Sequence, residues 1–235
     1  MSAADIMAAL FFGFLRFGPD GLPDDHFLLS KGHAVHVFHA CMVELERIAP
    51  SELPLSGMSG SRLGGHPTHR APGVEFATGS LGHALSVGVG IALAERLNGS
   101  GKRTVVLLGD GELQEGTIWE AALSAPRFDL GNLIAIVDAN GFQASGAVER
   151  IMPVEPIAEK WRAFRWNAVE IDGHDMRAIL QALAGTTSAT GPTAIIAHTV
   201  KGKGVPGVEG TGRAHYLRLT AAEADAALTL FEAPL

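Results

Sequence analysis

The fold of this chain is decided by two short stretches, Gly109-Asp110-Gly111-Glu112 and Asp138-Ala139-Asn140-Gly141-Phe142. An apolar run leads into each of them, residues 104–108 into the first and residues 133–137 into the second. Runs of this kind are typical of strands that are buried on both faces of a parallel sheet. Because an open parallel sheet binds its ligands beyond the carboxyl ends of its strands, Asp110 and Asn140 are predicted to lie at a ligand-binding edge.

Outside these stretches, strands and helices alternate along the chain. This alternation predicts an α/β fold, with an open parallel sheet, right-handed crossovers and helices on both faces. Residues 1–235 show no repeat or clear linker, so we expect a single domain. Residues 50–80 lack periodicity, and a loop of that length is often functional. The expected helices span residues 2–16, 33–48, 82–98, 114–125, 155–163, 175–185 and 220–230, the last opening on a capping box of Thr220 and Glu223, and the expected strands span residues 27–30, 103–108, 132–138, 167–171 and 193–199.

Composition and charge narrow the functional classes. The 235 residues suffice for one sizeable core, and a formal charge of −7 gives no electrostatic support for binding nucleic acid. Cys41 is the only cysteine, which excludes an intrachain disulfide and fits a cytoplasmic location. The apolar N-terminus carries Asp5 and no basic region, so we expect an amphipathic helix and no signal peptide. No window reaches the roughly 18 uninterrupted apolar residues of a membrane span.

The residue types at the two strand ends indicate a divalent cation. Carboxylate, side-chain amide and backbone carbonyl oxygens are hard donors, and Mg²⁺ takes such donors while it also holds a diphosphate. Gly109 and Gly111 let the chain turn sharply beside Asp110 and approach a diphosphate without a Cβ clash. The pair Asn140-Gly141 could form a plain hairpin turn, but the preceding strand and the partner at Asp110 favour a ligand role.

Taken together, the motifs resemble those of thiamine diphosphate enzymes, and specifically those of the transketolase group. The segments GDGELQEG, WEAA and NLIAIVDANG look like the cofactor motif of that family. The resemblance runs from about residue 2 to about residue 215, and it implies the N-terminal, diphosphate-binding subunit of a split transketolase. Further segments that agree in order are LSKGHA at 29–34, GGHP at 64–67, TGSLGH at 78–83, DGHD at 172–175 and TVKGKGVP at 199–206.

The resemblance also implies roles for individual residues. Asp110, Asn140 and the backbone carbonyl of Phe142 would hold Mg²⁺, and diphosphate oxygens and a water would complete its coordination. Histidines would serve in catalysis, since histidine donates hydrogen bonds and shuttles protons near neutral pH; those implied are His33, His66 and His215. The residues implied to contact the cofactor are His33, Gly79, Ser80, Leu81, His83, Gly109, Asp110, Gly111, Glu112, Asn140 and His215.

The sequence leaves two roles open for the lysines beside these motifs. Lys31 belongs to the LSKGHA segment, but a lysine is usually solvated. Lys201 and Lys203 could cradle an anion or form a solvated basic loop. His215 is followed by Tyr216, where members of the family usually carry Gly, so its alignment with the family's histidine is loose.

Alternative roles also stay open for acidic residues and histidines near the site. Glu115 resembles an acidic residue that supports the family's site and subunit interface, and it could equally be a solvated helix residue. Asp172 and His174 are expected to be structural more than catalytic. His83 stands where many members of the family carry glutamine, so it could reach the cofactor or merely begin a helix.

The resemblance implies chemistry that this chain would share with a second protein. Thiamine catalysis needs a glutamate that protonates N1′ of the aminopyrimidine, and in this family that glutamate lies on a separate pyrimidine-binding domain. We therefore expect a partner chain that supplies it, in an α2β2-like assembly. The reaction would be Mg²⁺-dependent transfer of a two-carbon ketol unit from a ketose donor to an acceptor.

Other functions stay open alongside this one. The chain could be the α-subunit of a 2-oxo-acid decarboxylating enzyme, or a non-catalytic subunit that retains the fold. A nucleotide-binding ATPase is disfavoured because there is no GxxxxGK[ST] loop. Members of the family carry a Ser-Gly-His-x-Gly loop before the first helix, and the chain begins inside that helix. We expect either a misplaced start or a remodelled substrate site that takes a specialised sugar or a carrier-protein thioester.

Overall fold

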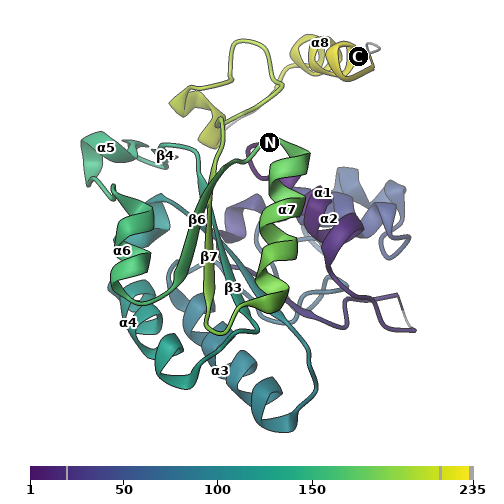
Figure 1. Ribbon diagram of the computed structural model, residues 1–235. Helices are drawn as coiled ribbons and strands as arrows, with labels where there is room; N and C mark the ends of the chain where they lie inside the picture. The colour runs from purple at the N-terminus through teal and green to yellow at the C-terminus, as the bar shows by residue number, and fades with distance from the viewer. Residues whose placement is uncertain (20, 217–218, 233–235) are drawn as a thin grey trace.

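The computed structural model describes residues 1–19, 21–216 and 219–232, and its centre is a parallel sheet of five strands (Figure 1). The strands follow the order β1-β2-β3-β7-β6, and all four pairings are parallel. This arrangement confirms the predicted open parallel sheet. The strands are β1 (His26–Leu29), β2 (Thr104–Gly109), β3 (Leu133–Ala139), β6 (Asn167–Asp172) and β7 (Thr193–His198).

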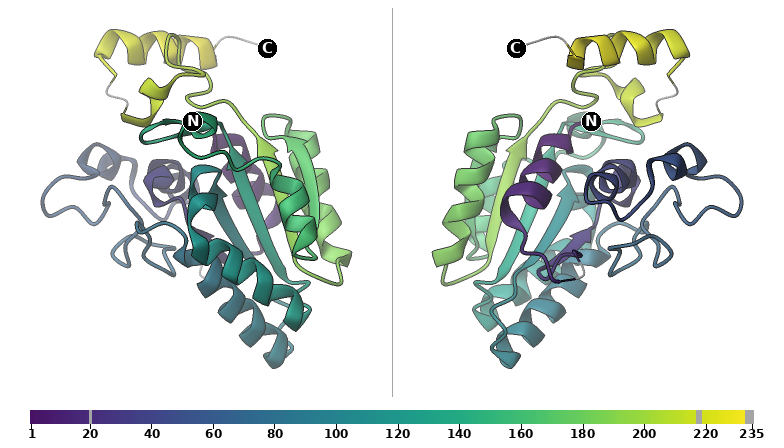
Figure 2. Two further views of the ribbon diagram at one scale, coloured as in Figure 1. Left: turned by 90° about the vertical axis from the view of Figure 1, so that its left-hand side faces the viewer. Right: turned by 90° about the vertical axis from the view of Figure 1, so that its right-hand side faces the viewer.

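Helices cover both faces of the sheet, as predicted (Figure 2). Successive side chains of a strand point to opposite faces, so Val105 packs into one core and Val106 into the other. Helices α1, α2 and α7 close the first core, and α3, α4 and α6 close the second. The helices are α1 (Ala4–Ala9), α2 (Val35–Glu44), α3 (His83–Asn98), α4 (Gly116–Ser124), α5 (Val148–Ile151), α6 (Ile157–Ala163), α7 (Met176–Gly185) and α8 (Ala221–Glu232).

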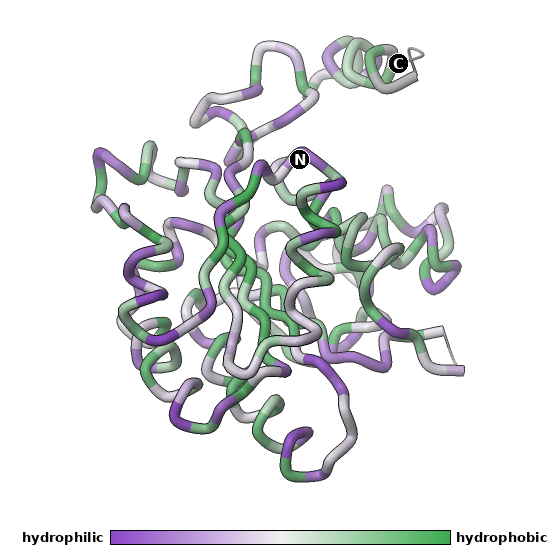
Figure 3. The backbone as a smooth tube through the Cα atoms, in the orientation of Figure 1, coloured by the Kyte–Doolittle hydropathy of each residue, from purple (hydrophilic) through white to green (hydrophobic). Residues whose placement is uncertain are grey.

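The central strands β2, β3 and β7 form a continuously apolar part of the backbone (Figure 3), whereas β6 at the edge of the sheet is largely exposed. Every residue of β2 is buried, and so are all residues of β3 except the last. This explains why the apolar runs were sufficient to locate these strands. Among the described residues, no helix combines the length and the apolar character that a bilayer span would need.

Several element boundaries differ from those expected. The first helix passes into a π-helical turn, Leu10–Phe14. The second ends at Glu44, because Glu46 adopts a left-handed conformation with φ of 59° and the Arg47 N–H returns to the Met42 carbonyl at 2.8 Å. Nothing in the sequence indicated the hairpin β4 (Phe142–Gln143) and β5 (Gly146–Ala147), since two-residue strands are too short to show a period.

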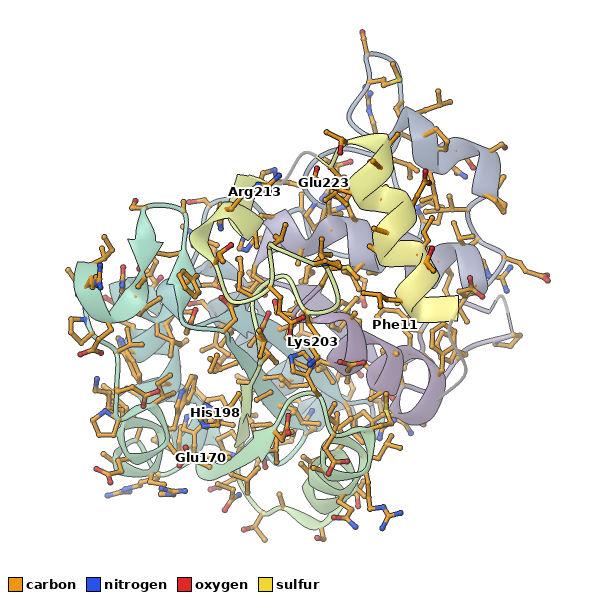
Figure 4. The ribbon with its side chains drawn as sticks, turned by 90° about the horizontal axis from the view of Figure 1, so that it is seen from above. Phe11, Glu170, His198, Lys203, Arg213 and Glu223 are labelled. Atoms are coloured by element: carbon orange, nitrogen blue, oxygen red, sulfur yellow. The ribbon has the colours of Figure 1, made fainter. Side chains whose placement is uncertain are left out.

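The chain after β7 crosses the carboxyl edge of the sheet and ends in α8, which lies above that edge (Figures 1 and 4). The predicted capping box is confirmed: the Glu223 N–H donates to Thr220 Oγ1 at 3.3 Å, and the Thr220 N–H donates to Glu223 Oε2 at 2.8 Å. Arg213 also donates to Glu223 at 2.7 Å, which ties the crossing segment to α8.

Candidate functional site

The predicted site residues gather at the carboxyl edge of the sheet. Parallel pairing places Gly109 opposite Asp138 and Ala139 opposite His198, so the ends of β2, β3 and β7 lie level with one another. The segment after β1 joins them, because the N–H groups of Ser30 and Lys31 both donate to the Leu107 carbonyl. Four segments far apart in the sequence therefore meet at this edge.

Asp110 and Asn140 belong to loops that bind each other directly. The buried Asp110 carboxylate accepts the Gly111 N–H at 2.8 Å and the Gly141 N–H at 2.5 Å. Asn140 is also buried, and its Oδ1 accepts the Phe142 N–H at 3.1 Å. Burial raises the pKa of Asp110 against the effect of these amide donors. A carboxylate, an amide oxygen and a nearby backbone carbonyl suit a hard cation.

The Glu112 carboxylate is occupied within the chain. Its Oε1 accepts the Ser30 hydroxyl and, at 2.9 Å, the Gly82 N–H, while its Oε2 accepts the Gly109 N–H at 3.1 Å. Burial raises the pKa of Glu112. These contacts hold together the loops after β1, before α3 and after β2. Its predicted contact with a cofactor stays a prediction, and its visible role is to fix the surrounding loops.

A buried ion pair lies beneath the Asp110 loop, and the sequence reasoning missed it. Asp138 has no exposed side-chain surface, and it accepts Lys31 Nζ at 2.5 Å, Ser2 Oγ at 2.8 Å and the Thr199 hydroxyl. Burial opposes ionisation, but the charge and hydrogen bond of Lys31 lower the pKa of Asp138 to about 2. The place of Lys31 just after a buried strand at this edge was the available signal.

Lys201 is a second buried cation at the same edge, only 7% exposed. In the described part of the chain, no carboxylate lies within ion-pair distance of its Nζ, which contacts His215 Nδ1 at 3.4 Å. Burial, and then the charge of Lys31, lower the pKa of Lys201 to about 8. Lys203 instead lies on the surface and pairs with Glu209 at 3.5 Å. The structure thus separates two lysines that the sequence could not distinguish.

His33 and His215 face each other across this cationic region. Their ring centroids are 5.1 Å apart. His33 is exposed as a residue, but the protein packed around its ring, followed by the charges of Lys31 and Lys201, lowers its pKa to about 3. Burial and the same lysines also lower the pKa of His215. Both rings are therefore neutral near pH 7, when each offers one donor and one acceptor nitrogen.

The loop that carries His66 lies beside the segment that carries His33. A Cβ on Gly32 would lie 2.8 Å from Thr78 Oγ1 and 3.1 Å from His66 Cδ2, so only glycine fits between them. A Cβ on Gly79 would lie 3.5 Å from His66 Cδ2. Thr78 Oγ1 also donates to the Leu29 carbonyl at 2.7 Å. The GGHP and TGSLGH segments thus meet LSKGHA next to the end of β1.

The segment Ser80–His83 leads into α3 near these histidines. His83 is exposed, and its Nδ1 lies 3.0 Å from the Leu81 carbonyl and 3.3 Å from the Ser80 carbonyl. Because a carbonyl only accepts, Nδ1 carries the proton and Nε2 is left as an acceptor. Glu115 is also exposed, so neither of its two interpretations is excluded.

The described residues contain no group of three or more His, Cys, Asp or Glu that could hold a metal ion. The predicted Mg²⁺ ligands differ in kind, since only Asp110 among them is a carboxylate. Their loops meet as predicted, while metal binding itself stays a prediction.

Comparison with known proteins decides the family. The model of the transketolase thiamine diphosphate binding domain matches residues 1–231. The chain belongs to the transketolase family. The resemblance inferred from the motifs is therefore confirmed.

Two relatives are themselves parts of multi-chain transketolases. The chain is 39% identical over 220 residues to one of the subunits of the apulose-4-phosphate transketolase of Phocaeicola vulgatus, covering 92% of this chain and 78% of that protein. It is 38% identical over 226 residues to a 6-deoxy-6-sulfo-D-fructose transketolase subunit of a Clostridium species, covering 94% of this chain and 82% of that protein.

The fold of transketolase agrees with this assignment. A crystal structure of the Pichia stipitis transketolase with sedoheptulose-7-phosphate is similar to 97% of this chain, with a TM-score of 0.88 and 31% identity. The chain spans only 36% of that larger protein. It therefore corresponds to one part of a full-length transketolase chain.

Proposed function

We propose that this chain is the diphosphate-binding subunit of a two-chain transketolase, which uses thiamine diphosphate and Mg²⁺ to transfer a two-carbon ketol unit. The observation that carries the proposal is Lys201, a buried cation without a carboxylate partner in the described residues, close to Asp110. Keeping such a charge out of water is costly, and a bound anion offsets that cost. A diphosphate with Mg²⁺ supplies negative charge for the lysines and a cation for Asp110.

The residues present fit this cofactor. Asp110, Asn140 and the Phe142 carbonyl would hold Mg²⁺, and Lys201 with His215 would bind diphosphate oxygens. His33 is neutral near pH 7, so it could donate one hydrogen bond to the cofactor or substrate without adding charge. When bound, thiamine diphosphate supplies a carbanion that attacks a carbonyl group.

The second half of the active site would come from another chain. Both relatives described above are named as subunits of transketolases, which supports the division of the enzyme between two chains. We infer a pyrimidine-binding partner that supplies the N1′ glutamate, and an α2β2 assembly. The donor would be a ketose, and the acceptor a specialised sugar or a carrier-protein thioester. A cytoplasmic location stays a prediction from the single cysteine.

The alternatives receive less support. The matched domain and the relatives described above are transketolases, which favours ketol transfer over 2-oxo-acid decarboxylation. A non-catalytic subunit would bind the cofactor without turnover, so activity measurements on the assembled complex distinguish it.

The test is the affinity of the full chain for thiamine diphosphate, measured by calorimetry with and without Mg²⁺. We expect Mg²⁺-dependent binding by the natural chain and none by Asp110→Ala with unchanged thermal unfolding. Equal affinity of both proteins would refute the metal assignment. Native mass spectrometry of the chain from its own host should then show a second protein and bound cofactor; a lone chain that binds no cofactor would refute the proposal.

The histidines need a separate test in the assembled complex. His66→Ala should slow turnover more than it weakens cofactor binding, because His66 is exposed and lies beside Gly79, one of the residues implied to contact the cofactor. If turnover and affinity both keep their natural values, His66 is structural.

A further inference from the structure

The DGHD motif has no place in the proposed cofactor contacts, yet all four of its residues are engaged. Asp172 Oδ1 accepts the His174 N–H at 2.8 Å, and Asp175 begins α7 by accepting two N–H groups of its first turn. The Gly173 N–H donates to the His198 carbonyl at 2.8 Å. A Cβ on Gly173 would lie 2.4 Å from Thr199 Cγ2, so the motif is pressed against the chain just after β7.

His174 links this motif to two distant segments. Its Nδ1 lies 2.7 Å from Asp5 Oδ2 of α1, and its Nε2 lies 2.8 Å from the Val200 nitrogen. The His174 side chain is only 13% exposed, whereas that of Asp5 is 41% exposed. Residues 5, 174 and 200 thus form a chain of hydrogen bonds from the first helix to the segment after β7.

The direction of these hydrogen bonds follows from the backbone. The Val200 N–H can only donate, so His174 Nε2 must accept and carries no proton. The ring proton therefore lies on Nδ1, where the Asp5 carboxylate accepts it. Asp5 stabilises this tautomer in the way that a carboxylate fixes a histidine in metal and catalytic sites.

Val200 stands between two residues of the site. On one side Thr199 donates to Asp138, and on the other Lys201 brings its buried cation to the carboxyl edge. Gly202 and Gly204 follow Lys201 and adopt left-handed backbone conformations, with φ of 74° and 80°. Glycine adopts such conformations without a Cβ clash, so the chain after Lys201 can turn sharply. The contact with His174 is therefore a fixed point directly beside Lys201.

We propose that His174, held in its Nδ1–H tautomer by Asp5, is a positioning residue that fixes the segment Thr199–Lys201 so that Lys201 faces the diphosphate site. This proposal rests on the proposed function, because the proposed function places the diphosphate at that site. It gives the DGHD motif a role at a distance from the cofactor. It also makes α1 part of the support of the site through a single carboxylate.

The tautomer is measured first, by ¹⁵N NMR of the histidine rings in the full chain without ligand. We expect His174 to show a protonated Nδ1 and an unprotonated Nε2, whereas neutral histidine in water favours the opposite tautomer. Asp5→Leu leaves the Nδ1 proton without its carboxylate acceptor and should raise the share of the common tautomer, whereas Asp5→Asn keeps an oxygen that can accept it and should change the tautomer less. A His174 ring protonated on Nε2 in the natural chain would overturn the proposal whether or not the chain binds any anion.

The consequence for the site is measured with inorganic diphosphate and Mg²⁺ as the probe. His174→Leu removes the acceptor of the Val200 N–H, and we expect about tenfold weaker diphosphate binding, the usual effect of one lost buried hydrogen bond. His174→Gln keeps an acceptor near the position of Nε2 and should stay within about threefold of the natural affinity. This rescue separates positioning from a general loss of packing.

The matched control is His198, which ends β7 one residue before Thr199. It pairs with Glu170 at 3.0 Å on the surface, with both side chains about half exposed, and Figure 4 shows the two close together. His198→Leu should leave diphosphate affinity unchanged. Equal losses in His174→Leu and His198→Leu, or no loss in either, would overturn the proposal.

The titration of Lys201 gives a readout that needs no ligand. With isotope-labelled lysine, His174→Leu should move the pKa of Lys201 from about 8 toward its ordinary value of 10.5, because a loosened segment lets the ammonium reach water. An unchanged titration in a folded His174→Leu would contradict the proposal. Absence of diphosphate binding by the natural chain would instead refute the proposed function.

Discussion

Each edge of the sheet buries an aspartate among cations, but the surroundings of the two aspartates differ. At the amino edge, Asp25 precedes β1 and accepts Arg16 Nη2 and Arg103 Nη2, both at 2.5 Å. At the carboxyl edge, Asp138 ends β3 and accepts Lys31 Nζ at 2.5 Å. Neither aspartate side chain has any exposed surface.

The difference lies in how far water reaches the cations. Arg16 and Arg103 keep 48% and 18% of their side chains exposed, so water solvates the charge that Asp25 does not neutralise. Lys31 is only 3% exposed, and Lys201 adds a second buried cation near the same carboxylate. Water therefore reaches the arginines at the amino edge, whereas Lys201 at the carboxyl edge is buried and, among the described residues, has no carboxylate within ion-pair distance. The same type of ion pair is partly reached by water at one edge and is buried at the other, which is the edge where we propose that diphosphate binds.

Asp138→Asn should have the largest effect on stability. It leaves Lys31 buried without a counter-charge, and we expect a loss of about 3–5 kcal/mol of unfolding free energy. Inorganic diphosphate should recover part of this loss, since the anion can take the place of the carboxylate. Denaturant unfolding with and without diphosphate measures both effects. If diphosphate stabilises Asp138→Asn no more than it stabilises the natural chain, the proposed difference between the two edges is wrong.

Asp25→Asn should cost less, about 2–3 kcal/mol, because the freed guanidinium groups can turn to water. Diphosphate should stabilise this variant only as much as it stabilises the natural chain. The same unfolding experiment applies, and an extra recovery with diphosphate would show that the amino edge also binds anions.

Lys201→Met should separate stability from binding. Removing a buried cation that has no carboxylate partner among the described residues should raise the unfolding free energy by about 1 kcal/mol, while diphosphate affinity should fall about tenfold or more. Lys203→Met is the matched control, since Lys203 lies in the same loop but on the surface. Calorimetry on the two variants decides the matter, and equal affinities would contradict the role of Lys201.

The pH dependence should be the smallest effect. The folded state lowers the pKa of Lys201 to about 8 from 10.5, so between these values the unfolded chain binds more protons. Stability should therefore rise with pH across that window as the cost of the buried charge disappears. Diphosphate affinity should fall over the same range by a few-fold. Lys201→Arg keeps its charge and should abolish the fall; a persistent fall would point to another group.

Much of the fold and part of the site could be predicted from local patterns. The apolar runs before Asp110 and Asn140 located two neighbouring strands, because a strand buried on both faces must be apolar throughout. Parallel strands then bring the residues that follow them to one edge. The hairpin β4–β5 was missed because it is too short to leave a pattern. The resemblance implied a cofactor contact for Glu112, but only the structure shows its carboxylate bound to three loops.

The sequence by itself determined the class of fold, the transketolase resemblance and the meeting of the Asp110 and Asn140 loops. Tertiary structure alone decided which lysines are buried, which carboxylate neutralises Lys31, and that His174 reaches Val200. The physical reason is that strand patterns depend on neighbours along the chain, whereas the cost of a charge depends on every group packed around it. Lys201 and Lys203 lie two residues apart, and only the surrounding fold makes one a buried cation and the other a surface ion pair.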